Sequence, residues 1–215
     1  AHPFRLLAHN GEINTIEGNR RWAQARSKVW KTPRFDIAEF NPVISMHGSD
    51  SQSLDNMLEL MIAGGMDLLQ ALRILVPPAT QSLEFKDADL AAFYEFYGLN
   101  TEPWDGPAGI VACDARYAAC MLDRNGLRPA RWLLTSDRHF LVASEAGVWE
   151  LPAERIVRKG KLGPGEMMAI DLKRGDLLDS DAVDRINRGR APYKQWLQQG
   201  VTYLQTELID PSLAE

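Results

Sequence analysis

The sequence has few cysteines, few histidines and no long apolar run, and each shortage excludes a class of protein. Two cysteines, Cys113 and Cys120, among 215 residues cannot build a disulfide framework or a four-cysteine zinc site. Both lie in apolar, strand-like stretches, where we expect buried and unreactive thiols. The four histidines show no i, i+4 pair and no cysteine at ligand spacing, so we expect no metal site. No apolar run approaches the roughly 18 residues of a membrane span, and no signal peptide opens the chain.

The charge balance is mildly acidic, with 24 Lys and Arg against 29 Asp and Glu and a net charge of −5. This balance excludes a general polyanion-binding surface, so we expect no nucleic-acid partner. A hydrophobic fraction of 45% and a charged fraction of 25% are typical of a folded globular chain. We expect a cytoplasmic location in a bacterial source, with a plastid source left open because a transit peptide would precede Ala1.

The first half of the chain, to about residue 100, has helical periodicity after a short strand-like run at residues 4–8. Apolar residues recur at i, i+3, i+4, i+7 and i+8 from Leu54 to Ile62, and Gly64 and Gly65 then end that helix. In the first expected helix, three residues are available to face a core: Ile16, Trp22 and Ala23. The other expected helices cover residues 15–30, 67–76 and 90–97.

The second half of the chain changes to short strands separated by turn residues. Asn125-Gly126 is a favoured hairpin dipeptide because both residues tolerate a positive φ. The end of the chain, from Asp181 to about Gly200, is helical and charged. Helices followed by antiparallel hairpins predict an α+β domain. The expected strands are residues 108–113, 117–122, 131–134, 139–143, 167–172 and 176–178.

The densest polar cluster is the stretch from His9 to Asn14, directly after the first strand-like run. An Asn side-chain amide beside a Gly N–H can present two donors toward one point, as an oxyanion hole requires. From composition alone, a strand-to-helix turn at Asn10-Gly11, with Asn14 or Thr15 capping the helix, is the better interpretation.

A second polar cluster runs from His47 to Ser51, at a boundary between a loop and a helix. A carboxylate there can receive a ligand ammonium group, which would give Asp50 a binding role. From spacing alone, N-capping is the better interpretation of Asp50, because Asp and Ser are favoured at that position.

Five stretches, taken together and in this order, resemble the glutaminase domain of the glutamate synthase large subunit, a class II glutamine amidotransferase. The resemblance covers nearly the whole chain, and its most specific parts are the first and third of these stretches. They are His9 to Thr15, Ser49 to Ser51, Glu102 to Pro107, Asp123 to Pro129 and Ala143 to Glu145.

The resemblance implies an N-terminal-nucleophile fold, in which antiparallel sheets lie between helix layers (αββα), here incomplete at the N-terminus. It implies that Asn10 and Gly11 supply the oxyanion hole and that Asp50 binds the α-amino group of L-glutamine. In the family, an N-terminal cysteine attacks the side-chain amide of glutamine, and its own α-amino group serves as the base.

One departure from the family pattern concerns the nucleophile. This chain starts with Ala1, and neither cysteine is N-terminal. We therefore expect the chain to be an inactive fragment, with the nucleophile and the arginine motif for the substrate carboxylate lying upstream. Arg5 is the substitute arginine that this sequence offers, although it falls in the strand that follows the family motif.

The resemblance also implies how the chain fits into a larger enzyme. Residues 1–190 would form a partial class II amidotransferase domain, and residues 191–215 a helical segment leading to the next domain. In the family, ammonia passes to a synthase domain that carries FMN and an iron–sulfur cluster and makes glutamate from 2-oxoglutarate. Electrons come from a nicotinamide-dependent partner subunit or from ferredoxin, and we expect neither cofactor nor any membrane partner in this chain.

Two other functions remain open at this point. The chain could be a non-catalytic glutamine-binding or interaction module that kept the scaffold and lost the nucleophile. It could also be the glutaminase domain of another class II amidotransferase. The sequences upstream of Ala1 and downstream of Glu215 would discriminate among the three.

Overall fold

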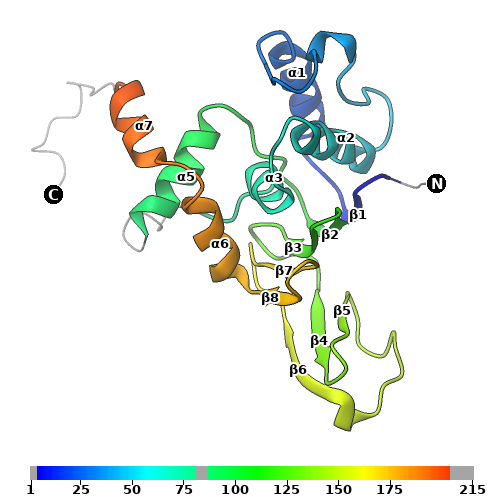
Figure 1. Cartoon of the computed structure of the whole chain (residues 1–215). Helices are drawn as coiled ribbons and strands as arrows, with labels where there is room; N and C mark the ends of the chain where they lie inside the picture. Colours follow the sequence, from blue (N-terminus) through cyan, green and yellow to red (C-terminus); the bar gives the residue numbers. More distant parts are fainter. Residues whose placement is uncertain (1–3, 81–86, 204–215) are drawn as a thin grey trace, which may run out of the picture.

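The computed structural model describes residues 4–80 and 87–203, and Figure 1 shows its helices and strands. Its strands form two antiparallel sheets. Five strands lie in the order β1-β2-β3-β7-β8, and three in the order β5-β4-β6. The helices are α1 (Ile16–Arg26), α2 (Asp50–Ala63), α3 (Leu68–Leu75), α5 (Ala88–Gly98), α6 (Ser180–Arg188) and α7 (Tyr193–Gly200). The strands are β1 (Leu7–Gly11), β2 (Ala108–Cys113), β3 (Tyr117–Leu122), β4 (Arg131–Thr135), β5 (Phe140–Ala143), β6 (Ile156–Lys161), β7 (Met167–Asp171) and β8 (Asp176–Leu178).

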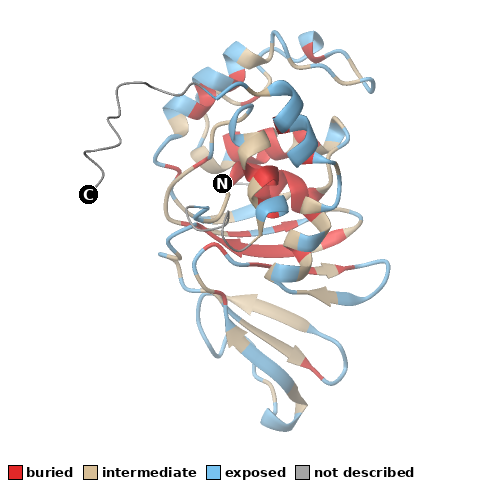
Figure 2. Cartoon of the chain, turned by 90° about the vertical axis from the view of Figure 1, so that its left-hand side faces the viewer, coloured by how far each residue is buried: buried red, intermediate tan, exposed pale blue. Residues whose placement is uncertain are grey.

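The main core lies between the helices and one face of the five-stranded sheet. Figure 2 shows buried residues concentrated in this layer. Helix α3 is buried along its whole length, and the apolar face of α2 packs beside it, as the i, i+3, i+4 pattern predicts. Ser49 and Asp67 cap the two helices with their side-chain oxygens.

A smaller core joins the two sheets. Cys120, Leu122 and Met168 point from the large sheet toward Trp132 and partly buried neighbours on the small sheet. The observed layers are therefore helix, sheet and sheet, and the predicted α+β class with antiparallel sheets is confirmed. Among the described residues, no α-helix covers the outer face of the three-stranded sheet (Figures 1 and 2).

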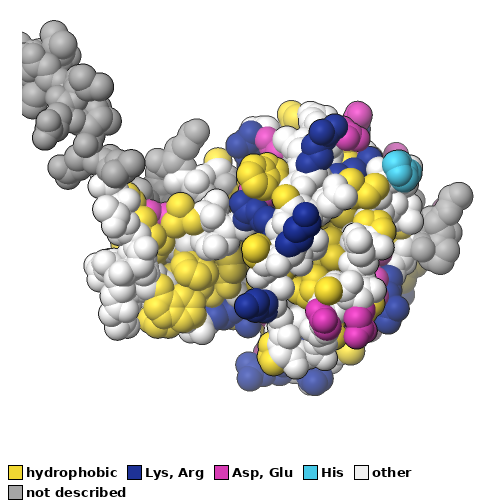
Figure 3. Space-filling model, turned by 90° about the horizontal axis from the view of Figure 1, so that it is seen from above, with side chains coloured by type: hydrophobic (Ala, Val, Ile, Leu, Met, Phe, Trp, Pro, Cys, Tyr) yellow, Lys and Arg dark blue, Asp and Glu magenta, His cyan; other side chains and the backbone are white. Residues whose placement is uncertain are grey.

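An aromatic cluster joins the end of the chain to the helical layer. Tyr193 and Trp196 of α7 pack at ring-centroid distances of 5.2–5.7 Å against Phe93, Phe96, Tyr97 and each other. Figure 3 shows hydrophobic side chains exposed over the part of the molecule formed by α5 and α7. Residues 204–215, the end of the predicted connecting segment 191–215, lie outside the described residues. No helix within residues 4–80 and 87–203 is both long and apolar enough to cross a membrane.

Helix α1 differs from the expectation that Trp22 faces a core. Trp22 is 50% exposed and has the Arg26 guanidinium 5.2 Å from its ring centroid. The buried positions of α1 are Asn19, Arg20 and Ala23, and Asn19 donates to the Pro103 carbonyl. Arg20 donates to Ser53 Oγ and to the Gly48 carbonyl, which explains how its charge is accommodated.

The two cysteines have different environments, so the expectation that both are buried is wrong for Cys113. Cys113 is exposed at the end of β2, whereas burial raises the pKa of Cys120 to about 12. Because the thiolate is the reactive form, we expect one thiol per chain to react quickly with a disulfide reagent at pH 8. The second should react only after denaturation. Rapid reaction of both thiols in the native protein, or of the one thiol left in a native Cys113→Ser variant, would contradict this assignment.

Candidate functional site

Strand β1 lies at the edge of the large sheet, and its register decides which backbone groups are free. Cys113 N–H donates to the Leu6 carbonyl and Glu12 N–H to the Pro107 carbonyl, so the even-numbered residues from Ala8 to Glu12 direct their N–H groups toward β2. The N–H groups of the odd-numbered residues therefore face away from the sheet. Carboxylates bind the N–H groups at the two ends of this edge: Asp55 Oδ1 accepts from Leu7 at 3.0 Å, and Asp50 Oδ2 accepts from Ile13 at 2.7 Å.

Between those two carboxylates, the N–H groups of His9 and Gly11 have no hydrogen-bond partner within the described residues. Asn10 is exposed, and its side chain has no such partner either. Asn10 and Gly11 pair with Gly109 and Ala108 of β2, so they belong to a strand. The prediction of a turn at this position is wrong. The Asn10 amide and the neighbouring Gly11 N–H are therefore both available at this sheet edge, and they are the two kinds of donor that an oxyanion hole uses.

Asp50 is the first residue of α2 and not its cap, because Ser49 takes the capping position. The N-capping interpretation of Asp50 is therefore wrong. Its Oδ1 accepts from the N–H and the hydroxyl of Ser51 at 2.7 and 3.2 Å. Burial raises the pKa of Asp50, but the hydrogen bonds from Ile13 and Ser51 outweigh it and hold the pKa below the ordinary value. Asp50 is thus a fixed, ionised and partly exposed carboxylate at the same edge.

The loop that contains Gly106 holds the strand end in place. A Cβ at Gly11 would lie 1.8 Å from the Pro107 carbonyl oxygen, and a Cβ at Gly106 would lie 1.9 Å from the Glu12 carbonyl oxygen. The two backbones can approach this closely only because both residues are glycine. Asp105 strengthens the contact, since its carbonyl accepts from Asn14 N–H at 2.8 Å.

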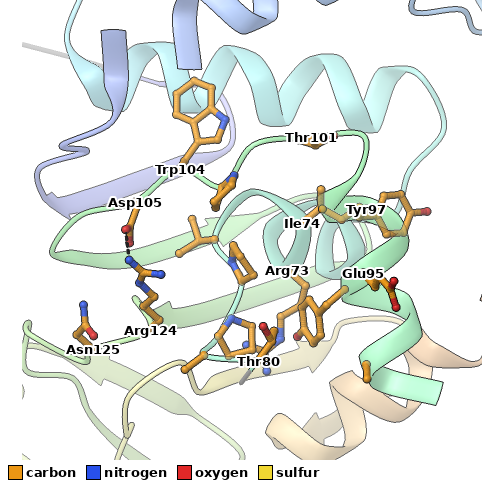
Figure 4. A pocket seen from close by; sticks show the side chains of 18 residues that line it. Arg73, Ile74, Thr80, Glu95, Tyr97, Thr101, Trp104, Asp105, Arg124 and Asn125 are labelled. Atoms are coloured by element: carbon orange, nitrogen blue, oxygen red, sulfur yellow. Dashed lines mark hydrogen bonds and ion pairs between the residues drawn. The ribbon is translucent and has the colours of Figure 1, made fainter. Parts of the chain in front are cut away.

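The hairpin motif that starts at Asp123 supports this loop from the other side. Asp123 Oδ1 accepts from Ala108 N–H at 3.0 Å, and Arg124 forms an ion pair with Asp105. Figure 4 shows Arg124 pointing toward Asp105 beside a cavity of about 550 Å³. Asn10, Gly11 and Asp50 do not line that cavity. Three of the stretches that the sequence singled out therefore meet around the end of β1.

Replacing Gly106 by alanine should displace the end of β1 and destabilise the fold. The added methyl would overlap backbone atoms, which cannot move as a side-chain end can. We expect a loss of about 2–4 kcal/mol in unfolding free energy, typical of a clash at a special backbone conformation. Chemical denaturation measures this loss. Gly18→Ala is the matched control, because a Cβ there meets no atom within 4 Å; equal behaviour of the two variants would contradict the steric argument.

Two residues of this region were not predicted from sequence. Asp55 accepts the N–H groups of Arg5, Leu6 and Leu7 at 2.8–3.0 Å, and His9 contacts Ser51. The one sequence signal for Asp55 is a charge directly after Leu54, in the middle of an apolar helix pattern. Arg5, the substitute for the carboxylate-binding arginine, is exposed and forms an ion pair with Glu59 at 3.1 Å.

Comparisons with known proteins identify the family to which the chain belongs. The family model for class II glutamine amidotransferases matches residues 1–196. Glutamate synthase [NADH] of Schizosaccharomyces pombe is 43% identical over 213 residues, covering 98% of this chain and 10% of that protein. The chloroplastic ferredoxin-dependent glutamate synthase of Oryza sativa subsp. japonica is 40% identical over 222 residues, covering 100% of this chain and 14% of that protein. A solved glutamine phosphoribosylpyrophosphate amidotransferase from B. subtilis has a TM-score of 0.46 and 18% identity over 80% of this chain and 28% of its own.

The chain belongs to the class II glutamine amidotransferases. The two relatives found by sequence are glutamate synthases, and the chain spans about a tenth to a seventh of their length.

Proposed function

We propose that this chain is the part of a glutamate synthase that binds L-glutamine and hydrolyses its side-chain amide to glutamate and ammonia. The observation that carries the proposal is the free edge of β1, where the Asn10 amide and the Gly11 N–H have no partner among the described residues and Ile13, two residues further on, holds the Asp50 carboxylate. Family membership and the similarity to glutamate synthases support it.

The spacing along this edge suits an amino acid with a side-chain amide. Gly11 and Ile13 are two residues apart, about 7 Å at the rise of a strand. Asn10 Nδ2 and Gly11 N–H would stabilise the negative oxygen that develops when the amide carbon becomes tetrahedral. Asp50, held by Ile13, would bind the α-ammonium group of the same glutamine.

The attacking group would come from outside the described site. Gly11 pairs with Ala108, the first residue of β2, whereas Cys113 is the last residue of that strand. At the rise of a strand, Cys113 therefore lies about 17 Å from Ala108. Cys120 is buried between the sheets. Neither cysteine can reach the donors, and we propose that this chain by itself does not turn over glutamine.

The rest of the reaction would take place in other parts of a longer polypeptide. We propose that ammonia passes to a synthase domain, which uses it with 2-oxoglutarate and reducing equivalents to make glutamate in the cytoplasm. FMN and an iron–sulfur cluster would belong to that domain, because two cysteines in different environments do not fit a cluster that needs three or four. NADH-dependent and ferredoxin-dependent relatives are both similar to this chain, so its sequence does not select the electron donor.

The test is ammonia release from glutamine by the full-length gene product, compared with its Asp50→Asn variant. We expect turnover in the parent protein and a KM for glutamine raised at least tenfold in the variant, because a charge-assisted hydrogen bond is lost. Glutamine binding without turnover in the full-length protein would support the binding module instead. Turnover with an unchanged KM in Asp50→Asn would remove Asp50 from the amine-binding role.

A further inference from the structure

The imidazole of His9 lies between β1 and α2, and its side chain is completely buried. Nδ1 lies 2.9 Å from Ser51 Oγ and 3.9 Å from Asp50 Oδ2. On its other side, Nε2 has no hydrogen-bond partner among the described residues. A buried polar atom of this kind costs free energy, so an explanation for the placement of His9 is required.

Counting donors assigns the tautomer of His9. Ser51 has one hydroxyl proton, and the ionised carboxylate of Asp50, 3.2 Å away, is its stronger acceptor. Ser51 Oγ must then accept a hydrogen bond from His9, which places the imidazole proton on Nδ1. Burial lowers the pKa of His9, the charge of Asp50 raises it, and the charge of Arg128 lowers it; the net direction is downward, which favours this neutral form.

The hydrogen bonds that run from His9 through Ser51 to Asp50 hold the Asp50 carboxylate in one orientation. Asp50 Oδ1 accepts from the N–H and the hydroxyl of Ser51, while Oδ2 accepts from Ile13 N–H. The remaining lone pairs of both oxygens are available to a ligand. Without the Nδ1–H donor, the Ser51 hydroxyl is free to rotate away from Asp50.

The same ring also borders the proposed oxyanion donors. A Cβ at Gly11 would lie 2.9 Å from His9 Nε2, so the imidazole fills the space beside the Gly11 backbone. His9 therefore touches both ends of the proposed glutamine site: the carboxylate through Ser51, and the Gly11 backbone directly.

We propose that His9 is a positioning residue for glutamine binding, which donates from Nδ1 to Ser51 and thereby fixes Asp50 for the α-ammonium group. The inference rests on the proposed function. It adds a residue whose effect is on binding, so its loss should raise KM while kcat stays close to that of the parent.

Three substitutions in the full-length gene product separate the ring's two nitrogens. His9→Asn places an amide N–H near the position of Nδ1, whereas His9→Gln places its amide near Nε2. We expect His9→Ala and His9→Gln to raise the KM for glutamine about tenfold, the effect of one well-placed hydrogen bond, with kcat within threefold of the parent. We expect His9→Asn to restore a KM within threefold of the parent.

Thermal unfolding shows which His9 variants are folded, and the Asp50→Asn variant tests the proposed amine site separately. If His9→Ala does not fold, the comparison of His9→Asn with His9→Gln still decides, because both keep an amide side chain in the buried space. A His9→Asn variant as impaired in KM as His9→Gln, or a KM unchanged in every folded variant, would overturn the role of His9. If neither Asp50→Asn nor any folded His9 variant changes KM, the proposed amine site itself fails. If Asp50→Asn raises KM and the His9 variants do not, only the inference about His9 fails.

Discussion

Replacing Asn10 by alanine in the full-length gene product should lower kcat for glutamine hydrolysis by about 10²–10³-fold, the usual loss for one oxyanion donor. The side chain is exposed and has no partner within the described residues, so its removal should cost little folding free energy. KM should change less than kcat, because the donor acts on charge that is present only in the transition state. Steady-state ammonia release measures both constants.

The control for this variant is Asn100→Ala. Asn100 is also exposed, and its amide donates to the Phe96 carbonyl at the end of α5, far along the chain from the proposed site. We expect its kinetic constants to equal those of the parent. A kcat for Asn10→Ala within threefold of the parent would remove Asn10 from the oxyanion role.

Replacing Arg73 by methionine should produce the largest loss of stability, about 3–5 kcal/mol, because it removes a buried cation and leaves the partly buried Asp184 carboxylate without its ion-pair partner. Arg73 is 1% exposed; it donates to the Gly165 carbonyl at 2.6 Å and to Ser180 Oγ at 2.8 Å. Its Nε lies 3.0 Å from Asp184 Oδ1. These contacts tie α3 to α6 and to the loop before β7. Denaturant unfolding of parent and variant measures the loss.

The loss of stability in Arg73→Met should depend on pH, and the pKa of Asp184 determines the direction. Burial raises the pKa of Asp184, whereas Arg73 lowers it. Removing Arg73 therefore raises the folded-state pKa further, so the folded protein binds a proton that the unfolded chain releases. The loss of stability should be smaller at pH 5 than at pH 8.

Two further variants test the same ion pair. Arg73→Met with Asp184→Leu should recover most of the lost stability, since both charges are then removed together. Arg5→Met is the surface control and should cost at most about 1 kcal/mol, because Arg5 and Glu59 are exposed. A loss for Arg73→Met as small as that for Arg5→Met would contradict the buried-pair argument.

Strands with alternating patterns and clear turns were predictable from sequence. The bounds of β2, β3 and β8 agree with the prediction because apolar residues and turn residues both delimit them. Strand β6 was missed: its sequence Ile-Val-Arg-Lys-Gly-Lys is polar and mostly exposed. Pairing with β4 makes it a strand, and a single sequence does not show that pairing.

The candidate site was predictable only through the family resemblance. Local reasoning favoured a turn at Asn10-Gly11 and a cap at Asp50, because both residue types are common in those positions. Contacts between residues distant in sequence decide instead that Asn10 lies in a strand and that Asp50 is not a helix cap. Gly109 pairs with Asn10, and Ile13 donates to Asp50. The roles of His9 and Asp55 depend on such contacts too, and the lone charge of Asp55 within an apolar helix pattern is the only local signal for either residue.

The interlocked glycines also determine when the site can form during synthesis. Asp105 donates to Thr15, which lies 90 residues earlier in the chain, and Asn19 donates to Pro103 across 84 residues. In a growing chain, about 90 further residues must therefore be synthesised after the His9 to Asn14 stretch before its partner loop exists. Closing so long a loop costs entropy before any contact offsets it. The β1 edge should consequently acquire its final shape late in folding, after α2 and α3 have formed.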